Sequence, residues 1–483
     1  MRFVRLGAIV AAFVVVALSA LHAQASLSQP YSTFIVTPDG TASVAHGNTQ
    51  QFSAVGMGSD EVTWTATGGS ISSSGVFVAG STPGRYAVTA LSGTRMVTVA
   101  VNVVEFTATT PRSMMPVAIN PGESIQNAVR VNPAGTTFLI KRGVHRRQAV
   151  HPKDGMVFVG EPGAVLDGEK TPGPAFDIYQ TRNVVIRGLR ITNYAPVNTN
   201  AAIDAAGSEG SLVEGNEIDH NANSDIMVRT YGVTIGNTST VRRNVIHDNG
   251  WLGINSSKAM DTLIEGNDIY ANPPALFNDT VGEAANIKLF DSGRITIRGN
   301  YVHDSIFRGI WVDTMRPDVT IEFNRVVNHG RAGIWYEVSY RGMIRNNYVA
   351  NAGYNQTPIY DWLRGGGIEV SNSPDVSVID NTVVNSLNGI IGLQAKSYRD
   401  GPYGPSQLRN FLVQGNLVVM ARGQTGITED SGNANVFTSW NNRFVSNRFE
   451  LLNNAAPFAW MGRHLDERQW QAYGQGVNDV FSR

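Results

Sequence analysis

Two carboxylates occupy equivalent places in a repeated segment of the sequence. Asp313 ends the segment GIWVD at residues 309–313, and Glu337 ends GIWYE at residues 333–337. The segments begin 333 − 309 = 24 residues apart, a period typical of stacked repeats built from short strands. Because neighbouring strands lie about 4.8 Å apart, we expect the two carboxyl groups about 5 Å from each other. A pair at that distance can act as nucleophile and acid/base in a retaining glycosidase.

The alternative is that both carboxylates are solvated and take no part in chemistry. Like charges that face each other destabilise a sheet, so a plain surface would tend to avoid this pair. Two close carboxylates also shift each other's pKa in opposite directions, which suits one acid and one nucleophile. The functional interpretation is therefore preferred.

The strands that carry the pair must present alternate side chains to opposite faces. An apolar Ile opens each repeat and must face inwards, so the first and third residues after it face outwards. Polar and aromatic outward residues are concentrated in the middle repeats, as the series shows: Met227 and Arg229, Asn255 and Ser257, Lys288 and Phe290, Trp311 and Asp313, Trp335 and Glu337, Glu369 and Ser371, Ile391 and Leu393.

Several of these outward side chains suit a carbohydrate ligand. We expect Trp311 and Trp335 to stack on sugar faces. Lys288 could hold a substrate carboxylate or pair with Asp313, and Glu369 is expected to contact sugar hydroxyls. The sequence therefore predicts a substrate site around the carboxylate pair.

Two histidines follow a repeated Asn by three residues, at the turn before the site face. His247 precedes Asp248, and His303 precedes Asp304. The preferred interpretation is that each His pairs with its neighbouring Asp. His303 is the better placed to reach substrate, because its repeat leads into Trp311.

The composition limits the other functions open to the chain. It has 483 residues, a formal net charge of −1 and no Cys. Near-zero charge argues against a nucleic-acid binder, and thiol chemistry is impossible. Asp219, Asp248 and Asp304 line a turn and could bind Ca²⁺ through oxygen, but a solvated turn is preferred, so no metal or other cofactor is predicted.

Two columns of residues define the repeat. From Ile to the next Asn the gap is commonly 13, and from Asn to the next Ile it is commonly 10, so one coil takes about 23 residues. A buried Asn at a turn can bond to the Asn one coil above and form a ladder. The Asn column contains Asn216, Asn244, Asn267, Asn300, Asn324, Asn347, Asn381 and Asn416, and the Ile column contains Ile203, Ile226, Ile254, Ile287, Ile310, Ile334, Ile368, Ile390 and Ile427.

Residues 116–454, which hold these columns, resemble the right-handed parallel β-helix superfamily of pectate-lyase-like proteins. The resemblance implies an all-β solenoid and leaves the activity open, since the superfamily holds several kinds of enzyme and non-enzyme. Insertions at 272–285 and 354–366 fall at the same turn and bracket the carboxylate coils, and a third occupies 395–408. Such grouped loops usually build a binding site, and Trp362 in the second suits a sugar ring.

The segments GIWVD, IEFN at 321–324 and GIWYEV at 333–338 resemble the active-site coils of β-helix glycoside hydrolases of the β-xylosidase type. That resemblance implies that Asp313 is the nucleophile and Glu337 the acid/base. The expected partner is a polysaccharide or oligosaccharide substrate. The protein is expected to be a monomer.

Two other functions stay open. A polysaccharide lyase or uronate epimerase would need a base, for which Lys288 or His303 is available. It would also need Arg229, Lys288 or Ca²⁺ to neutralise a substrate carboxylate. The third possibility is a surface protein that binds glycans without turning them over.

The N-terminal part indicates export and a separate small domain. Residues 1–25 have a basic start, an apolar run and small residues, as in a secretory signal peptide, so we expect a secreted, periplasmic or cell-surface bacterial protein with no transmembrane span. In residues 30–104 the segments QF at 51–52, VTW at 62–64 and GVF at 75–77 resemble the bacterial Ig-like (group 2) family. This resemblance implies a β-sandwich that serves as spacer or adhesive module, joined to the β-helix through a linker at 105–115.

Both ends of the solenoid need covers, because an open coil exposes its core. Residues 122–129 are predicted to form a short helix with Ser124 as N-cap. Residues 455–483 are predicted to form a C-terminal cap, with a helix from His464 to Trp470 and Gly474 ending it.

Overall fold

The computed structural model describes residues 35–37, 42–45, 49–55, 62–93, 95–104, 115–197, 200–222, 229–273, 283–314, 316–356, 364–396, 400–401 and 403–482. The predicted signal peptide, Trp362 and most of the linker lie outside these residues. Among the residues described, no helix has both the length and the apolar character needed to cross a bilayer.

The N-terminal strands form small sheets around their own apolar core. The core contains Phe52, Phe77 and Val88, each fully buried. The predicted strands are present, whereas the assignment to the Ig-like family stays a prediction. Pairing joins β1 to β4, β2 to β9, β8 and β5, and β3 to β7 and β6, with bounds β1 Ile35–Thr37, β2 Ala42–Ala45, β3 Thr49–Gln51, β4 Ser53–Val55, β5 Thr63–Ala66, β6 Gly69–Ile71, β7 Val76–Ala79, β8 Gly84–Ser92 and β9 Arg95–Val104.

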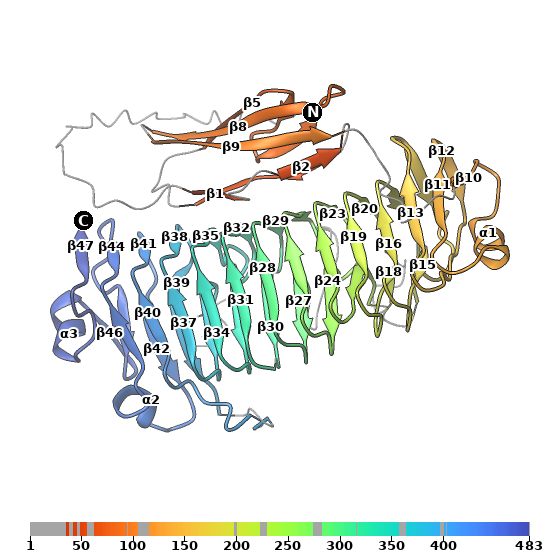
Figure 1. The fold of residues 1–483 in the computed structure, drawn as a ribbon. Coiled ribbons are helices and arrows are strands. Elements are labelled where there is room, and N and C mark those ends of the chain that lie inside the picture. The colour runs from red at the N-terminus through yellow and green to blue at the C-terminus, as the bar shows by residue number, and fades with distance from the viewer. Residues whose placement is uncertain are drawn as a thin grey trace, which may run out of the picture. The chain divides into compact units, whose positions relative to one another are not determined.

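The rest of the chain winds through three long parallel sheets, one strand of each per complete coil (Figure 1). Sheet 1 contains β10 Val117–Ile119, β11 Thr137–Ile140, β13 Val157–Gly160, β16 Val185–Arg187, β19 Leu212–Glu214, β22 Thr240–Arg242, β25 Leu263–Glu265, β28 Ile295–Arg298, β31 Val319–Glu322, β34 Gly342–Arg345, β37 Val376–Ile379, β40 Leu412–Gln414 and β43 Arg443–Val445.

Sheet 2 follows sheet 1 after a turn of about two residues that carries the repeated Asn. It contains β12 Gly143–Arg146, β14 Ala164–Asp167, β17 Arg190–Thr192, β20 Glu217–Asp219, β23 Val245–His247, β26 Asp268–Tyr270, β29 Tyr301–Ser305, β32 Arg325–His329, β35 Tyr348–Ala352, β38 Thr382–Val384, β41 Leu417–Val419, β44 Arg448–Glu450 and β47 Val480–Ser482.

Sheet 3 follows sheet 2 after longer turns, and two of the predicted insertions lie there, between β26 and β27 and between β35 and β36. It contains β15 Phe176–Asp177, β18 Ala201–Asp204, β21 Tyr231–Ile235, β24 Leu252–Ser257, β27 Ala285–Phe290, β30 Arg308–Asp313, β33 Ile334–Glu337, β36 Gly366–Ser371, β39 Asn388–Gln394, β42 Thr425–Glu429, β45 Phe458–Trp460 and β46 Arg463–Leu465, the last pair antiparallel.

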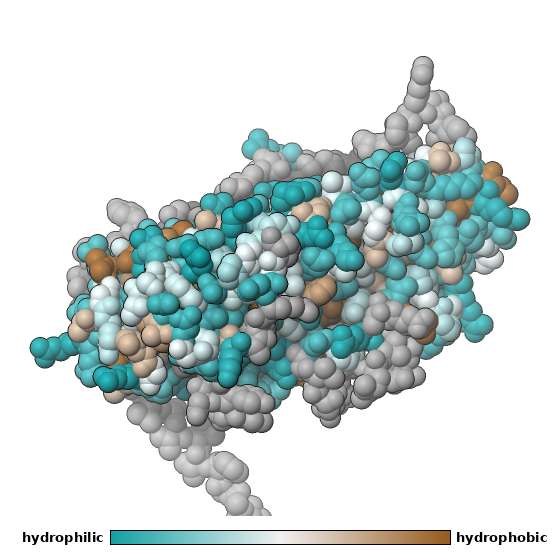
Figure 2. Space-filling view, turned by 90° about the horizontal axis from the view of Figure 1, so that it is seen from below, coloured by the Kyte–Doolittle hydropathy of each residue, from teal (hydrophilic) through white to brown (hydrophobic). Residues whose placement is uncertain are grey.

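The Ile column lines the core of the solenoid, as predicted. Ile254, Ile287, Ile310, Ile334, Ile368 and Ile390 are register partners along sheet 3, and each is fully buried. The outward face seen in Figure 2 is mainly hydrophilic, with scattered apolar residues. The alternation of inward apolar and outward polar side chains therefore sets the fold.

Two members of the predicted Ile column are wrong in register. Ile226 lies outside the described residues, and the place between Ile203 and Ile254 in the column is taken by Val233. Ile427 pairs with Gly392, two residues beyond Ile390. In both coils another β-compatible residue could occupy the column, and the repeat length alone did not decide between them.

The predicted Asn ladder is present. Each Asn side chain donates through Nδ2 to Oδ1 of the Asn in the next coil, at 2.9–3.0 Å, from Asn216 through to Asn447. A second, shorter ladder, which the sequence pattern did not reveal, runs through Asn221, Asn249, Asn272 and Asn286. The ladders satisfy the hydrogen-bonding groups of Asn residues that are buried at these turns.

The interior of the main ladder is expected to be essential for stability. Asn324 accepts from the Asn300 backbone N–H at 3.0 Å and donates to the Ile297 carbonyl at 2.9 Å. Asn324→Ala should lower the free energy of unfolding by about 3 kcal/mol, because buried donors and acceptors lose their partners. Urea unfolding would measure the loss, with Asn355→Ala at an exposed turn as the control, expected within about 0.5 kcal/mol of the unchanged protein. Equal effects of the two substitutions would contradict the importance of the ladder.

Helices cover both ends of the solenoid (Figure 1). The N-terminal helix α1 spans Ile125–Val131, and Ser124 caps it by accepting from the Asn127 N–H, as predicted. Near the C-terminus, α3 spans Glu467–Ala472 with a capping box at Asp466, so it begins later than predicted because residues 463–465 form β46. A short helix, α2, spans Asn435–Thr438.

Candidate functional site

The outward face of sheet 3 contains a cleft of about 920 Å³. It follows the sheet from β18 to β33, on the side of the coils that carries the predicted carboxylates. Its described lining residues are Asp204, Ala206, Arg229, Tyr231, Thr234, Trp251, Leu252, Asn255, Ser256, Ser257, Glu283, Lys288, Phe290, Arg308, Trp311, Asp313, Thr314, Trp335, Glu337 and Val338.

Asp313 and Glu337 are register partners on the adjacent strands β30 and β33, and both line the cleft. Register partners in a parallel sheet have backbones about 4.8 Å apart. Asp313 accepts from the Thr314 hydroxyl at 2.9 Å, and its Oδ2 lies 3.3 Å from the Lys288 Nζ. Glu337 accepts from the Trp311 Nε1–H at 2.9 Å. The two carboxylates thus have different hydrogen-bond and ion-pair partners, and Glu337 also interacts electrostatically with Arg308.

Trp311 and Trp335 stack on each other, with ring centroids 4.9 Å apart and an angle of 18° between the planes. Lys288 Nζ lies 3.5 Å from the Trp311 ring, and the Arg308 guanidinium lies within 4.5 Å of both rings. Only 5% of each Trp is exposed. The expectation that these faces stack on sugars therefore stays a prediction, and a sugar would have to compete with the ring and the cations that already contact them. The stack forms a rigid support for Glu337.

Burial lowers the pKa of both cations beside the stack, Lys288 and Arg308. Burial lowers the pKa of Lys288, while the neighbouring Asp313 opposes the change. Burial, together with the nearby Arg331, lowers the pKa of Arg308 to about 9. The Lys288 ammonium therefore loses its proton more readily than that of an exposed Lys. The resulting neutral amine could act as a base.

Arg229 lies in the same cleft but not on a strand, since β21 begins at Tyr231. Its guanidinium pairs with Glu283 at 2.6 Å and lies 4.8 Å from the Trp251 ring. The prediction that Arg229 belongs to the site agrees with this position, although the strand assigned to it was wrong. Its charge is already balanced by Glu283.

Glu369 is register partner to Trp335 but is not found among the described residues that line the cleft. It is 2% exposed, accepts from the Gly366 N–H at 2.9 Å and lies 3.8 Å from Arg364. Burial raises its pKa, against the pull of Arg364. The expected contact with sugar hydroxyls stays a prediction; in this structure Glu369 pairs with Arg364, whose guanidinium lies 5.0 Å from the Trp335 ring.

His303 lies on β29 in sheet 2, and it too is not found among the described residues lining the cleft. Its Nδ1 lies 2.7 Å from Asp304 and its Nε2 lies 2.9 Å from Asp268. His247 likewise contacts Asp248 at 2.8 Å. The predicted His–Asp pairing is confirmed, and the predicted reach of His303 to substrate is not supported, because the ring stacks on Tyr270 and Tyr301 of sheet 2 whereas the cleft lies on sheet 3.

The two carboxylates beside His303 predict a pH dependence of stability. Burial alone would lower the pKa of His303, but the hydrogen bonds that its ring donates to Asp268 and Asp304 outweigh burial and raise the pKa. A group with a raised pKa stabilises the fold below its unfolded value, about 6.5, and loses that effect as pH rises through the folded value. His303→Gln should therefore cost more unfolding free energy at about pH 5 than at about pH 9, by on the order of 1 kcal/mol. Urea unfolding at both pH values would measure this, and equal losses would contradict it.

Arg308 was missed by the sequence reasoning, together with Leu252 and Tyr231. Arg308 has the same parity as the buried Ile310, so strict alternation would direct it into the core. The strand begins at the turn from sheet 2, however, and residues at this end cluster outside the core with Trp311 and Trp335, as do Leu252 and Ala285. The sequence signal that could have identified Arg308 is its charge at a position two residues before Ile310 of the Ile column.

Solved structures of low sequence identity share the fold. The A-module of mannuronan C-5 epimerase AlgE4 from Azotobacter vinelandii has a TM-score of 0.52 at 15% identity, over 71% of this chain and 93% of that one. The A-module of AlgE6 from the same organism has a TM-score of 0.50 at 13% identity, over 74% and 93%. XylC, solved with xylose, has a TM-score of 0.52 at 12% identity, over 74% and 82%.

Comparisons with curated protein sequences and with family models give two further results. No curated protein sequence matches this chain significantly. The family described as right-handed beta helix region matches residues 168–282 and 291–465, which is more than half of the chain. These are the coils whose sheets and ladders are described above, and the chain therefore belongs to the right-handed β-helix region family.

Proposed function

We propose that this protein is a retaining glycoside hydrolase that acts on a polysaccharide or oligosaccharide. The observation that carries the proposal is the pair of register partners Asp313 and Glu337, which line one cleft on adjacent strands. Carboxyl groups about 5–5.5 Å apart are what a retaining mechanism requires, and a separation of one strand is of that size.

The two carboxylates have environments that suit different roles. Asp313, next to the Lys288 ammonium, attacks the anomeric carbon as its bond to the leaving oxygen breaks. Glu337 gives its proton to that oxygen, and in the second step takes a proton from the water that releases the sugar from Asp313. The Trp311 N–H orients the Glu337 carboxyl group.

The similar structures support a carbohydrate substrate only at the level of the fold. Two are named mannuronan C-5 epimerases and one was solved with xylose, so proteins with this fold include some that act on or bind sugars. In the present cleft the three described cations have acidic neighbours: Lys288 pairs with Asp313, Arg229 pairs with Glu283, and Arg308 interacts electrostatically with Glu337 and Glu369. Such a balance favours a neutral glycan over a polyanion.

Lys288 favours one second candidate, a polysaccharide lyase or uronate epimerase. It lines the cleft, and burial lowers its pKa, as a base that removes a proton beside a uronate carboxyl would need. Arg229 or Arg308 would then neutralise that carboxyl. His303, the other base considered, lies on sheet 2 and is the weaker choice.

Incubation with a panel of neutral and acidic polysaccharides distinguishes these functions. A hydrolase releases reducing ends without new ultraviolet absorbance, whereas a lyase leaves an unsaturated sugar that absorbs. Epimerisation changes the sugar composition without chain cleavage, and a binding protein retains glycan without turnover. Reducing ends without absorbance support the proposal, and any of the other three results overturns it.

The Trp311 hydrogen bond yields a specific prediction. Trp311→Phe keeps most of the stacked ring but removes the donor to Glu337, so we expect kcat to fall by about 10-fold, with little change in KM. Trp335→Phe is the matched control, because its Nε1 donates to Ser371 at 2.8 Å rather than to a catalytic carboxylate. Steady-state kinetics of both variants would test this, and equal kcat values would show that the donor is unimportant.

We propose, further, that the mature protein acts outside the cytoplasm. The basic and apolar start of the sequence supports export, and polysaccharides are substrates found outside cells. Sequencing the N-terminus of the protein secreted by a bacterial host would test this. A start near residue 26 is expected, and retention of Met1 in the cytoplasm would contradict it.

A further inference from the structure

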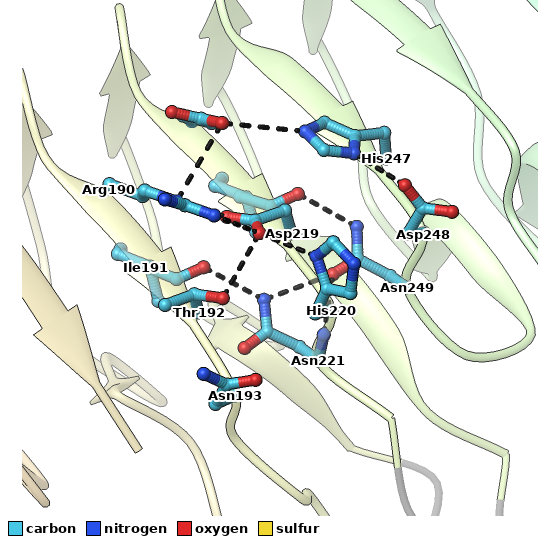
Figure 3. A network of polar contacts seen from close by, with 12 residues as sticks. Arg190, Ile191, Thr192, Asn193, Asp219, His220, Asn221, His247, Asp248 and Asn249 are labelled. Atoms are coloured by element: carbon cyan, nitrogen blue, oxygen red, sulfur yellow. Dashed lines mark hydrogen bonds and ion pairs between the residues drawn. The ribbon is translucent and has the colours of Figure 1, made fainter. Parts of the chain in front are cut away.

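A cluster of metal-ligating side chains lies on sheet 2, away from the cleft residues of sheet 3. His247 is the register partner of Asp219 in the next coil, so His220, which follows β20 directly, is level with Asp248, which follows β23. Figure 3 shows the two imidazole rings and the Asp248 carboxylate turned toward one another. These three residues each offer a ligand atom within 4.8 Å of the others.

A buried carboxylate fixes the orientation of His220. The Asp219 side chain has no exposed surface, and it accepts two bonds from Arg190, at 3.0 and 2.8 Å. It also lies 2.7 Å from His220 Nδ1. The solvated turn expected for Asp219 is therefore wrong. Because Nδ1 faces Asp219, the ring leaves Nε2 directed toward the neighbouring coil (Figure 3).

His247 is held in a similar way from the other side. Its Nδ1 lies 2.8 Å from Asp248 Oδ2, and its Nε2 lies 3.6 Å from Glu217. Only 12% of the His247 side chain is exposed, so the ring is a fixed element of the cluster. Each ring thus turns one nitrogen to an outer carboxylate, the arrangement that orients histidine ligands around metals in proteins.

We propose that His220, His247 and Asp248 bind one divalent transition-metal ion of the Zn²⁺ class. Two imidazoles and one carboxylate suit such an ion, whereas Ca²⁺ takes oxygen ligands. Ligand atoms around Zn²⁺ lie about 3.3 Å apart, so the site must contract slightly. His220 can make that movement, since 55% of its side chain is exposed.

A second set of ligands, Glu217, Asp219 and His247, also lies within 4.8 Å. It is a weaker choice, because Arg190 already neutralises Asp219 and lies 3.7 Å from Glu217. A cation there would have to displace the guanidinium. In the preferred set Asp219 keeps Arg190 and serves only to orient His220.

Ions bound here would join two adjacent coils, at β20 and β23, because the ligands come from both. Binding to the folded state alone stabilises a protein, so the midpoint of thermal unfolding should rise with metal concentration. The sequence showed no metal motif because the ligands come from different coils.

The test uses the full chain, free of any affinity tag and stripped with a chelator, then titrated with Co²⁺ and Zn²⁺. We expect one Co²⁺ per chain with visible absorption bands, displacement by Zn²⁺, and a higher midpoint of thermal unfolding with Zn²⁺. His220→Asn and His247→Gln should each weaken binding at least about 10-fold. Asn tolerates the left-handed backbone of His220, φ 54°, so that variant should fold normally.

His464→Asn is the matched control, since this His is exposed on β46 and outside the cluster. It should bind Co²⁺ as the unchanged protein does. The proposal is overturned if the unchanged protein binds no Co²⁺ or Zn²⁺, or if His220→Asn binds as tightly as His464→Asn. A Glu217→Gln variant that loses binding while His220→Asn keeps it would instead assign the ion to the other set.

Discussion

Replacing Asp313 with Asn is expected to lower kcat/KM by at least about 10⁴-fold, because a neutral amide cannot replace the carboxylate that forms the glycosyl–enzyme bond. The amide keeps the size of the side chain and its bond from Thr314 but removes the charge that pairs with Lys288, so circular dichroism and urea unfolding of the variant would accompany the kinetics. Kinetics on the substrate that the polysaccharide panel identifies would measure the loss.

The control for Asp313 is Thr314→Val, which removes the hydroxyl that donates to Asp313 but leaves the carboxylate. A loss within about 10-fold is expected for that variant. Asp313→Ala with added azide should form a glycosyl azide of inverted configuration, since azide then enters from the face that the nucleophile occupied. Retention of more than about a tenth of the activity by Asp313→Asn would contradict its role as nucleophile.

Replacing Glu337 with Gln is expected to lower kcat by about 10²–10⁴-fold on natural glycosides, whose leaving groups need a proton. Aryl glycosides with acidic leaving groups should be cleaved to the glycosyl–enzyme much faster, because their departure needs no proton. The second step would then limit the rate, and azide should accelerate it with retained configuration.

The matched control for Glu337 is Ser371→Ala. Ser371 is the register partner of Glu337 in the next coil, and its hydroxyl contacts Trp335. The Ser371→Ala variant should leave the dependence of the cleavage rate on the leaving group unchanged. An equal loss by Glu337→Gln on substrates with good and poor leaving groups would show that Glu337 is not the acid/base.

The fold was predictable because a solenoid repeats its physical requirements once per coil. The Ile that must be buried and the Asn that must satisfy a tight turn recur together, so each coil confirms the previous one. The register failed where the column residue was not unique, as at Val233 in place of Ile226. Insertions at the turns change the number of residues between successive members of a column. Spacing along the chain alone therefore does not identify which residue occupies the column.

The carboxylate pair was predictable for a related reason, since alternation places Asp313 and Glu337 on one face once Ile310 and Ile334 face inwards. The roles of the neighbouring side chains were not predictable in this way. Whether Trp311 offers a face to a ligand depends on what covers it, here Lys288, Arg308 and Trp335, and these contacts cross three coils. Alternation also fails at the end of a strand, which concealed Arg308.

Glu369 shows the same limit for a charged residue. Its outward position was correct, but it turns to the Gly366 N–H and toward Arg364 rather than to the cleft. A charge that is buried must be paired, and its partner comes from a loop whose path the sequence pattern did not describe.

Trapping the glycosyl–enzyme tests the central proposal most directly. The protein would be incubated with an activated 2-deoxy-2-fluoro glycoside of the sugar that the polysaccharide panel identifies, digested, and mapped by mass spectrometry. The account predicts one sugar per chain, attached to Asp313 and absent from Asp313→Asn. A sugar on another residue, or turnover with inverted configuration and no adduct, would contradict the assignment of Asp313 and Glu337 as a retaining pair.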